Sequence, residues 1–336
     1  MNETILSMSN KDTDVISFEV PTPFPVGPVN LYLLIGNKIT LVDTGPKTEV
    51  AWKSFIYQLN KNGFRIKDID QVILTHHHVD HSGLLSILSQ YHPKLKIYAH
   101  KATIPWIERR VESIKELIYF YKDLYEENGL SANEIETIKN YHNYFNQYFD
   151  PVYIDGSLED GDTVEGNTNW KVIHTPGHSQ GHISLYNKQT KTLIAGDHLI
   201  ENLSSGTFIE PPVEKNRARP KSLVDFKRSL ERIRKMDIEQ VYSGHGKVID
   251  QPMEIIDNYL SRLNHRAEKI KDLLTEKPMT VYEAMMSAYP DRYHKNLPLF
   301  FSEILGTLDL LEVKGEASSI RENGLIRYYL KSKVRQ

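Results

Sequence analysis

The sequence predicts an α/β fold in its first 250 residues and a smaller, mainly helical domain after them. Short apolar runs rich in β-branched residues alternate with amphipathic helical stretches from about residue 15 to residue 250. After Asp250 this alternation stops, and helical patterns follow one another. A chain of 336 residues is also longer than one average domain. We therefore expect one domain at 1–250 and a second at 251–336.

Composition narrows the chemistry open to this chain. It contains no cysteine, which excludes disulfides and thiol catalysis and leaves histidine and carboxylates as the strong metal ligands. The net charge of −3 predicts no polyanionic partner. No apolar run approaches the roughly 20 residues that span a membrane, and residues 1–14 lack the apolar core of a signal peptide. These features together predict a cytoplasmic protein.

The first elements follow from local patterns. Gly36-Asn37 is a tight-turn dipeptide between two apolar runs, which predicts a β-hairpin. Residues 47–62 carry apolar side chains at helical spacing. The strands expected in this part of the chain are 29–35, 38–42, 70–74 and 94–100.

Residues 102–149 interrupt the strand pattern with two long helical stretches, 102–127 and 131–149. Ser131 and Glu134 have the spacing of a capping box at the start of the second stretch. Both stretches contain more aromatic residues than one buried helix face needs. We expect this insertion to serve as a lid over a substrate or as a dimer surface, and the sequence leaves both open.

Strands resume after Asp150, and polar residues beside glycines follow them. The expected strands are 170–174, 183–186, 191–195 and 240–243, with a helix at about 220–235. His178, Asp197 and His245 each follow one of these strands next to a glycine. Glycine lets the backbone pass close to a ligand, so this arrangement is typical of a metal site.

Four histidines and one aspartate gather at 75–83, between the strand at 70–74 and a helix that begins near Leu84. Imidazoles fill a core poorly, and a buried carboxylate is costly unless it is paired or bound to a metal. His76 and His78 point the same way on an extended segment and can reach one ion. Asp80 and His81 come after the chain turns, so they can face a second ion beside the first. The cluster therefore predicts two metals side by side.

The ordered set of these residues resembles the metallo-β-lactamase-fold hydrolase superfamily over about residues 15–250. The motifs that carry the resemblance are Asp43, His76-x-His78-x-Asp80-His81, His178, Asp197 and His245. The resemblance implies a four-layer αββα sandwich. It also implies one metal held by His76, His78 and His178, a second held by Asp80, His81 and His245, and Asp197 as the bridge.

The resemblance also sets expectations for the chemistry. Nitrogen and oxygen ligands suit two divalent ions, zinc first, with manganese or iron as alternatives. A hydroxide held between two such ions can attack a carbonyl carbon or a phosphorus at neutral pH. We therefore expect a metal-dependent hydrolase in which Asp80 also takes part in catalysis. True β-lactamases of this fold often have Cys or Ser at the position of Asp197, so antibiotic hydrolysis is not expected.

Other residues near the motifs have expected roles outside the ligand set. Asp43 either forms a turn or orients a metal-bound histidine from behind. His77 is expected to pack or to hydrogen-bond behind the site, and His182 either to support a ligand from behind or to lie in the core. His198 directly follows the bridging aspartate, and we expect it to contact substrate or polarise an oxyanion. Loops at 25–27 and 208–212 are expected to border the pocket.

The C-terminal segment has the element order of a winged helix. Helices are expected at 252–275, 280–288 and 298–310, followed by a hairpin that ends at 328–330. This order resembles the winged-helix appendage of several members of the superfamily. The recognition helix of such a domain would be 298–309, which contains no Lys or Arg for phosphate contacts. We expect a structural or oligomerisation role, with a homodimer as one outcome, and no nucleic-acid partner.

The expected substrate is a small molecule with an ester, thioester or lactone carbonyl. The chain is mildly acidic and the insertion is aromatic, and an aromatic lid buries an acyl chain better than it neutralises phosphate. The alternative is a phosphodiesterase or endoribonuclease of the same fold. The basic cluster at Lys215, Arg217, Arg219 and Lys221 either contacts phosphate or belongs to a solvated loop. A redox or binding module fits less well, because residues 252–336 lack a flavodoxin-like βα repeat.

Overall fold

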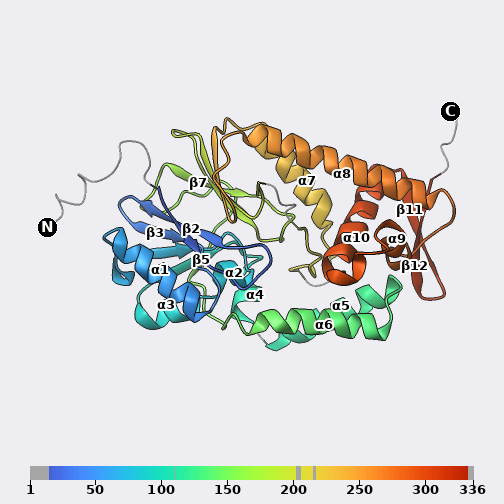
Figure 1. Cartoon of the computed structure of the whole chain (residues 1–336), viewed down its shortest axis with the longest axis horizontal. Helices are drawn as coiled ribbons and strands as arrows, with labels where there is room; N and C mark the ends of the chain where they lie inside the picture. The colour runs from blue at the N-terminus through green and yellow to red at the C-terminus, as the bar shows by residue number, and fades with distance from the viewer. Residues whose placement is uncertain (1–14, 110, 202–205, 215–216, 332–336) are drawn as a thin grey trace.

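Two β-sheets pack face to face in the computed structural model of this chain, and helices cover their outer faces (Figure 1). The structure describes residues 15–109, 111–201, 206–214 and 217–331, with only the backbone of residues 111–114.

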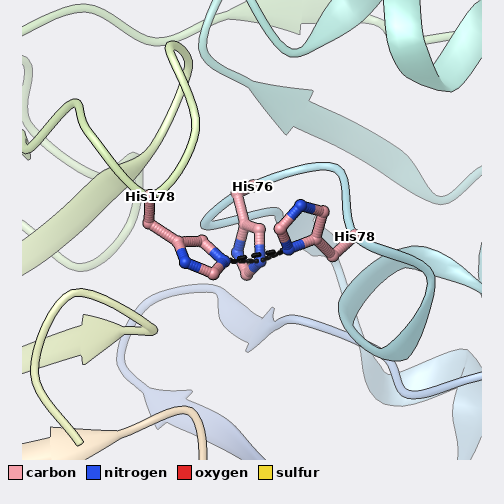
Figure 2. Close-up of side chains that lie close together, drawn as sticks. All are labelled: His76, His78 and His178. Atoms are coloured by element: carbon pink, nitrogen blue, oxygen red, sulfur yellow. Dashed lines mark hydrogen bonds between the residues drawn. The ribbon is translucent and has the colours of Figure 1, made fainter. Parts of the chain in front are cut away.

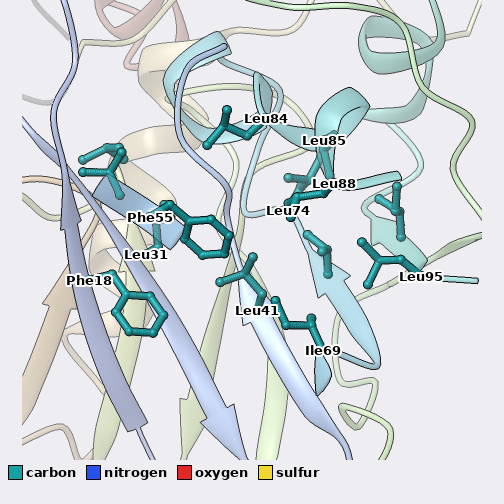
Figure 3. Close-up of a cluster of buried hydrophobic side chains, with 14 of the residues drawn as sticks. Phe18, Leu31, Leu41, Phe55, Ile69, Leu74, Leu84, Leu85, Leu88 and Leu95 are labelled. Carbon is teal, nitrogen blue, oxygen red and sulfur yellow. The ribbon is translucent and has the colours of Figure 1, made fainter. Parts of the chain in front are cut away.

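The first sheet has six strands that lie side by side in chain order. The first three strands pair antiparallel, and the third to the sixth pair parallel. Helices α1 (Glu49–Lys61) and α3 (Leu85–Tyr91) pack against one face and form the core drawn in Figure 3. The strands are β1 (Val15–Val20), β2 (Val29–Ile35), β3 (Ile39–Val42), β4 (Gln71–Ile73), β5 (Lys96–Ala99) and β6 (Gly156–Ser157).

The second sheet has four strands in the order β10-β9-β8-β7. Helices α7 (Ser222–Ile233) and α8 (Pro252–Leu274) cover its outer face through residues such as Phe226 and Ile256. The strands are β7 (Trp170–His174), β8 (Ile183–Asn187), β9 (Thr192–Gly196) and β10 (Gln240–Ser243). The strands expected from the sequence in both sheets are thus confirmed.

The inner faces of the two sheets share one apolar cluster. Leu34 and Val42 come from the first sheet, and Val172, Leu185 and Ile194 come from the second. Both sheets are therefore buried on both faces, which explains why their strands read as continuous apolar runs rather than alternating ones. The layers run helix, sheet, sheet, helix, as the resemblance implied.

The insertion and the C-terminal segment form a second, helical body with its own core (Figure 1). The stretch expected as one helix at 102–127 is two helices, because Arg109 adopts a left-handed φ of +45° that ends the first of them. The capping box of Ser131 and Glu134 is confirmed. The first of these helices, α4 (Ile104–Glu108), packs through Ile107 in the core of the first sheet. The elements of the helical body are α5 (Val111–Glu127), α6 (Ala132–Asn146), α9 (Val281–Ala288), α10 (Leu297–Val313), β11 (Ala317–Glu322) and β12 (Leu325–Leu330).

Helix α8 joins the two bodies. Ile256 and Tyr259 in its first half pack in the core under the second sheet, whereas Ile270 and Leu274 in its last turns pack in the helical core. The same helical core contains Tyr125 of the insertion. The expected helices and hairpin after Asp250 are therefore present, while their description as a separate winged-helix domain stays a prediction.

Candidate metal centre

The motif at 75–83 lies between β4 and α3, at the carboxyl end of the first sheet. The chain leaves β4 at Ile73 and enters a one-turn helix, α2 (Val79–Ser82). His178, Asp197 and His245 follow strands β7, β9 and β10 of the second sheet. The site is thus built from strand ends of both sheets.

Three imidazoles meet at one point, as Figure 2 shows. His76 Nε2 lies 3.0 Å from His78 Nδ1, and His178 Nε2 lies 3.2 Å and 2.9 Å from these two atoms. Nitrogens about 2.0–2.1 Å from a tetrahedral zinc ion would be roughly 3.3 Å apart, so this spacing fits one ion.

A second group of ligand-type residues lies beside the first. His245 Nε2 is 3.4 Å from Asp80 Oδ2, and ligand atoms of Asp80, His81 and His245 all lie within 4.8 Å of one another. The Nε2 atoms of His81 and His245 are buried and make no hydrogen bond within the described part of the chain. Buried polar atoms of this kind usually have a partner, so a bound cation fits this group.

Asp197 faces both groups. Its Oδ1 lies 3.2 Å from His81 Nε2, and its Oδ2 lies 3.6 Å from Nε2 of both His178 and His245. The structure therefore brings together all seven residues expected as ligands, with Asp197 in the position expected of a bridge. That these residues bind metal ions remains a prediction.

Backbone carbonyls hold two of the histidines from behind. His178 Nδ1 donates to the Gly206 carbonyl over 2.6 Å, and His245 Nδ1 donates to the Pro28 carbonyl over 2.7 Å. Each bond places the ring hydrogen on Nδ1, so Nε2 offers its lone pair to the centre.

Asp43 orients His81, one of the two roles expected for it. Its Oδ2 accepts hydrogen bonds from His81 Nδ1 and Thr75 Oγ1, and its Oδ1 accepts one from Thr75 N, each over 2.8 Å. Asp43 is buried and has a φ of +62°, which costs a non-glycine residue of order 1–3 kcal/mol. The three hydrogen bonds explain why this conformation persists.

His182 fixes the backbone of Asp197. Its Nε2 accepts a hydrogen bond from Asp197 N over 3.2 Å, so its Nδ1 carries the ring hydrogen and donates to Thr175 Oγ1 over 2.8 Å. That His182 supports a metal ligand in this way remains a prediction.

His198 does not reach the opening of the site. Its side chain is fully buried, and its ring packs on Phe226 of α7, with centroids 4.6 Å apart. The expected contact with substrate is therefore corrected to a packing role, because a residue next to a ligand can point to the opposite side of the strand end. His77 packs behind the site as expected, stacked on Trp106 at 4.5 Å.

Two glycines allow these strand ends to approach one another. A Cβ on Gly244 would lie 2.2 Å from Asp197 Oδ1 and 2.9 Å from His81 Cε1. Gly196 has a φ of +49°, and a Cβ there would lie 2.8 Å from His182 Nε2. Any larger residue at either position would displace a proposed ligand or its support.

The two groups differ in their electrostatics. Burial, and then the neighbouring imidazoles, lower the pKa values of His76 and His78 well below the ordinary histidine value. Burial also opposes protonation of His81, but the carboxylates of Asp197 and Asp43 outweigh it and raise its pKa well above that value. His76 and His78 are therefore neutral and can offer nitrogen lone pairs to an ion. His81 is protonated, so an ion bound to it would take the place of that proton.

Glu210 is a residue near the site that no sequence motif indicates. It is buried, its Oε2 accepts hydrogen bonds from Gln180 N and Nε2, and its Oε1 lies 3.7 Å from His77 Nε2. Phe208, from the loop expected to border the pocket, places its ring 5.3 Å from that of His78. A charged residue in a loop is usually exposed, so the residue type of Glu210 could not reveal its burial.

Comparison with known proteins agrees with this geometry. The family model of the metallo-beta-lactamase superfamily matches residues 24–245. The chain is 33% identical to "Probable metallo-hydrolase YqjP" of Bacillus subtilis, covering 94% of this chain and 97% of that protein. It is 28% identical to the "Beta-lactamase-like protein 2 homolog" of Caenorhabditis elegans, covering 86% of this chain and 80% of that protein.

Among solved structures, the chain is similar to the metallo-beta-lactamase family protein TTHA1429 from Thermus thermophilus. The TM-score is 0.76 at 26% identity, covering 95% of this chain and 99% of that one. The fold and the ligand-type residues define a metallo-hydrolase, and the chain belongs to the metallo-beta-lactamase superfamily. This family membership confirms the prediction that the protein is a hydrolytic enzyme.

Proposed function

We propose that this protein is a dinuclear hydrolase that attacks the carbonyl carbon of a small ester, thioester or lactone and breaks its acyl C–O or C–S bond. The observation that carries the proposal is the pair of ligand groups that share Asp197. Their donors suit zinc, with manganese or iron as alternatives. Two divalent ions held there would lower the pKa of a water molecule enough for attack at neutral pH.

The side chains of the site would divide the remaining tasks. Asp80 is the more exposed of the two carboxylates, with 13% of its side chain accessible against 9% for Asp197. This small difference supports our proposal that Asp80 contacts the attacking water as well as an ion. Asp43 and His182 would hold His81 and Asp197 in place while charge develops.

Aromatic side chains beside the centre favour an acyl substrate. Phe208 places its ring 5.3 Å and 5.9 Å from those of His78 and His178. Phe24, in the loop before β2, packs at 5.1 Å on Phe145 of the insertion. Apolar surface of this kind stabilises a bound acyl chain by about 25 cal/mol per Å² buried.

The basic cluster gives little support to phosphate cleavage. Arg219 makes a two-pronged ion pair with Asp309 at 2.7 Å and 2.8 Å, and Lys221 lies 3.1 Å from Glu312. Arg217 pairs with a neighbouring glutamate, and Lys215 lies outside the described residues. Arg219 and Lys221 therefore attach the loop to α10, whereas Arg217 pairs within the loop.

A substrate panel tests the proposal. Purified protein is assayed with aryl esters, acyl thioesters, lactones and a single-stranded RNA, beside its His245→Ala variant. We expect carbonyl hydrolysis that the variant loses, with the fold retained by circular dichroism. The exposed His265 of α8 provides the matched control, His265→Ala. RNA cleavage without carbonyl hydrolysis would favour the alternative function.

The C-terminal elements are proposed to act as a winged-helix-like structural domain. Most of α10 is buried, including Phe301, Ile304 and Leu308, so this helix is unavailable to a nucleic-acid groove.

Exposed Ile118 and Tyr119 on α5 favour a homodimer contact. We also propose a cytoplasmic location. Among the described helices, none has the length and apolar character to cross a membrane.

A further inference from the structure

The three histidines of the first ligand group come from two segments of the chain, as Figure 2 shows. His76 and His78 lie on the motif segment that follows β4, whereas His178 lies on the loop between β7 and β8. One ion needs all three nitrogens at once, so the two segments have to be held at a fixed separation. The residues behind the ligands therefore determine how well this group is preorganised.

Glu210 binds the loop that carries His178. Its Oε2 accepts hydrogen bonds from Gln180 N over 2.8 Å and from Gln180 Nε2 over 3.1 Å. Gln180 Nε2 also donates to the Pro211 carbonyl over 2.6 Å, and Phe208 N donates to the His178 carbonyl over 3.4 Å. The segment that contains Glu210 is therefore bonded to this loop both before and after Glu210.

Gln180 is also held from its other side. His174 Nε2 donates to the Gln180 carbonyl over 2.8 Å, and the carbonyl of the following glycine accepts a hydrogen bond from Thr103 Oγ1 over 3.0 Å. The N–H, the C=O and the side chain of Gln180 are thus all bonded. Because the backbone is fixed here, the bonds from Gln180 to Glu210 also constrain His178, two residues earlier.

The other oxygen of Glu210 faces the motif segment. Oε1 is buried, has no hydrogen-bond partner within the described residues, and lies 3.7 Å from His77 Nε2. The His77 ring is stacked on that of Trp106, with the ring planes inclined by 15°. His76 and His78 point to the opposite side of an extended segment from His77. Contacts that fix the His77 side chain therefore also fix the direction of both ligands.

We propose that Glu210 is a positioning residue that holds the first ligand group together, because it joins the segment of His76 and His78 to the loop of His178. This inference rests on the proposed dinuclear centre but not on the class of substrate. Glu210 is not among the residues grouped closely enough to hold an ion, and it is 2% exposed, so water does not compete for its contacts. Residues behind metal ligands typically contribute about 10- to 100-fold to metal affinity.

The second ligand group has supports on other segments. Asp43, which directly follows β3, accepts a hydrogen bond from His81, and Pro28, directly before β2, accepts one from His245. Loss of Glu210 should therefore weaken the binding of one ion and not of the other. A general loss of stability would not make this distinction.

Two parents with one ligand group each allow the ions to be measured separately. His245→Ala removes a ligand of the second group, so the remaining ion occupies the first group, and His178→Ala does the reverse. The Kd of zinc is measured for both parents, with and without Glu210→Leu, by competition with a chromogenic chelator. We expect Glu210→Leu, which is similar in size but makes no hydrogen bonds, to raise the Kd about 10- to 100-fold in the His245→Ala parent and to leave it unchanged in the other.

Two further variants separate positioning from packing and from stability. Glu210→Gln should restore most of the affinity of the first group, because its amide oxygen accepts the bonds from Gln180 and its NH₂ donates toward His77. Asp309→Asn is the control for lost stability, because its buried carboxylate pairs with Arg219 and Lys221 rather than with either ligand segment. It should leave both Kd values unchanged.

An unchanged Kd in the His245→Ala parent, an equal rise in both parents, or Glu210→Gln no better than Glu210→Leu would overturn the assignment. If circular dichroism shows that Glu210→Leu does not fold, Gln180→Met takes its place, since it removes only the side-chain donor to Glu210. An unchanged Kd of the first group in that variant would overturn the assignment too. If the wild-type protein binds fewer than two zinc ions, the proposed function fails instead, so the two failures are distinguishable.

Discussion

The burial of Glu210 predicts a loss of stability as pH rises through neutrality. The carboxyl group is 2% exposed, and its Oε1 has no hydrogen-bond partner within the described residues. Burial raises the pKa of Glu210 from 4.5 to about 7, although the hydrogen bonds from Gln180 lower it. The folded protein therefore holds a proton that the unfolded chain has released, and the stability that this proton supplies is present at low pH and lost above pH 7.

The magnitude follows from the two pKa values. Between pH 5 and pH 8, proton linkage with a pKa of 4.5 unfolded and about 7 folded lowers the free energy of unfolding by about 2.5 kcal/mol. Glu210→Gln imitates the neutral acid and does not titrate. The stability of the wild type relative to this variant should therefore fall by about that amount over this range.

Urea unfolding of the metal-loaded wild type and Glu210→Gln at pH 5, 6, 7 and 8 measures the difference between their free energies of unfolding. Titrating groups that both proteins share contribute equally to each and cancel in this difference. Glu276→Gln, at an exposed position of the chain, provides the control and should show no such trend. A wild-type to Glu210→Gln difference that stays constant within about 0.5 kcal/mol across this range would refute the reasoning.

Three further substitutions probe the site and its supports. Asp43→Asn should weaken metal binding about 10- to 100-fold in a titration calorimeter, because the amide supports the bound histidine less well. Gly244→Ala should abolish metal uptake because its methyl group meets a ligand carboxylate, whereas Gly246→Ala, with open space around its Cβ, should keep it and lose only about 1 kcal/mol of stability through its positive φ. Asp309→Asn leaves Arg219, whose side chain is 20% exposed, without its buried carboxylate partner and should lower the free energy of unfolding by about 3 kcal/mol, with metal content preserved.

Local patterns were sufficient to predict most of the fold. The strands are continuous apolar runs because both faces of each sheet are covered, and the proposed ligands occur at strand ends beside glycines. His76 and His78 converge because they lie two residues apart on an extended segment. These features depend on neighbours in the sequence, so the sequence can show them.

Contacts between distant segments could not be predicted in the same way. The hydrogen bond from the Tyr121 hydroxyl to the Ile209 carbonyl joins the insertion to a loop far along the chain, and neither residue lies in a motif. The pairing of Arg219 with Asp309 likewise depends on how the loop meets α10. The direction of His198 depends on the rotation of the backbone after Asp197, which residue type does not determine. In each case the partner is determined by tertiary packing rather than by spacing along the chain.

Metal analysis tests the central proposal most directly. The protein is purified without added metal, its metal content per chain is measured by mass spectrometry, and hydrolysis is followed through chelation and reconstitution with zinc, manganese or iron. The two ligand groups around Asp197 predict close to two ions per chain, with activity lost on chelation and restored by a divalent metal. One ion or none per chain at full activity, or hydrolysis that chelation leaves unchanged, would contradict the dinuclear centre.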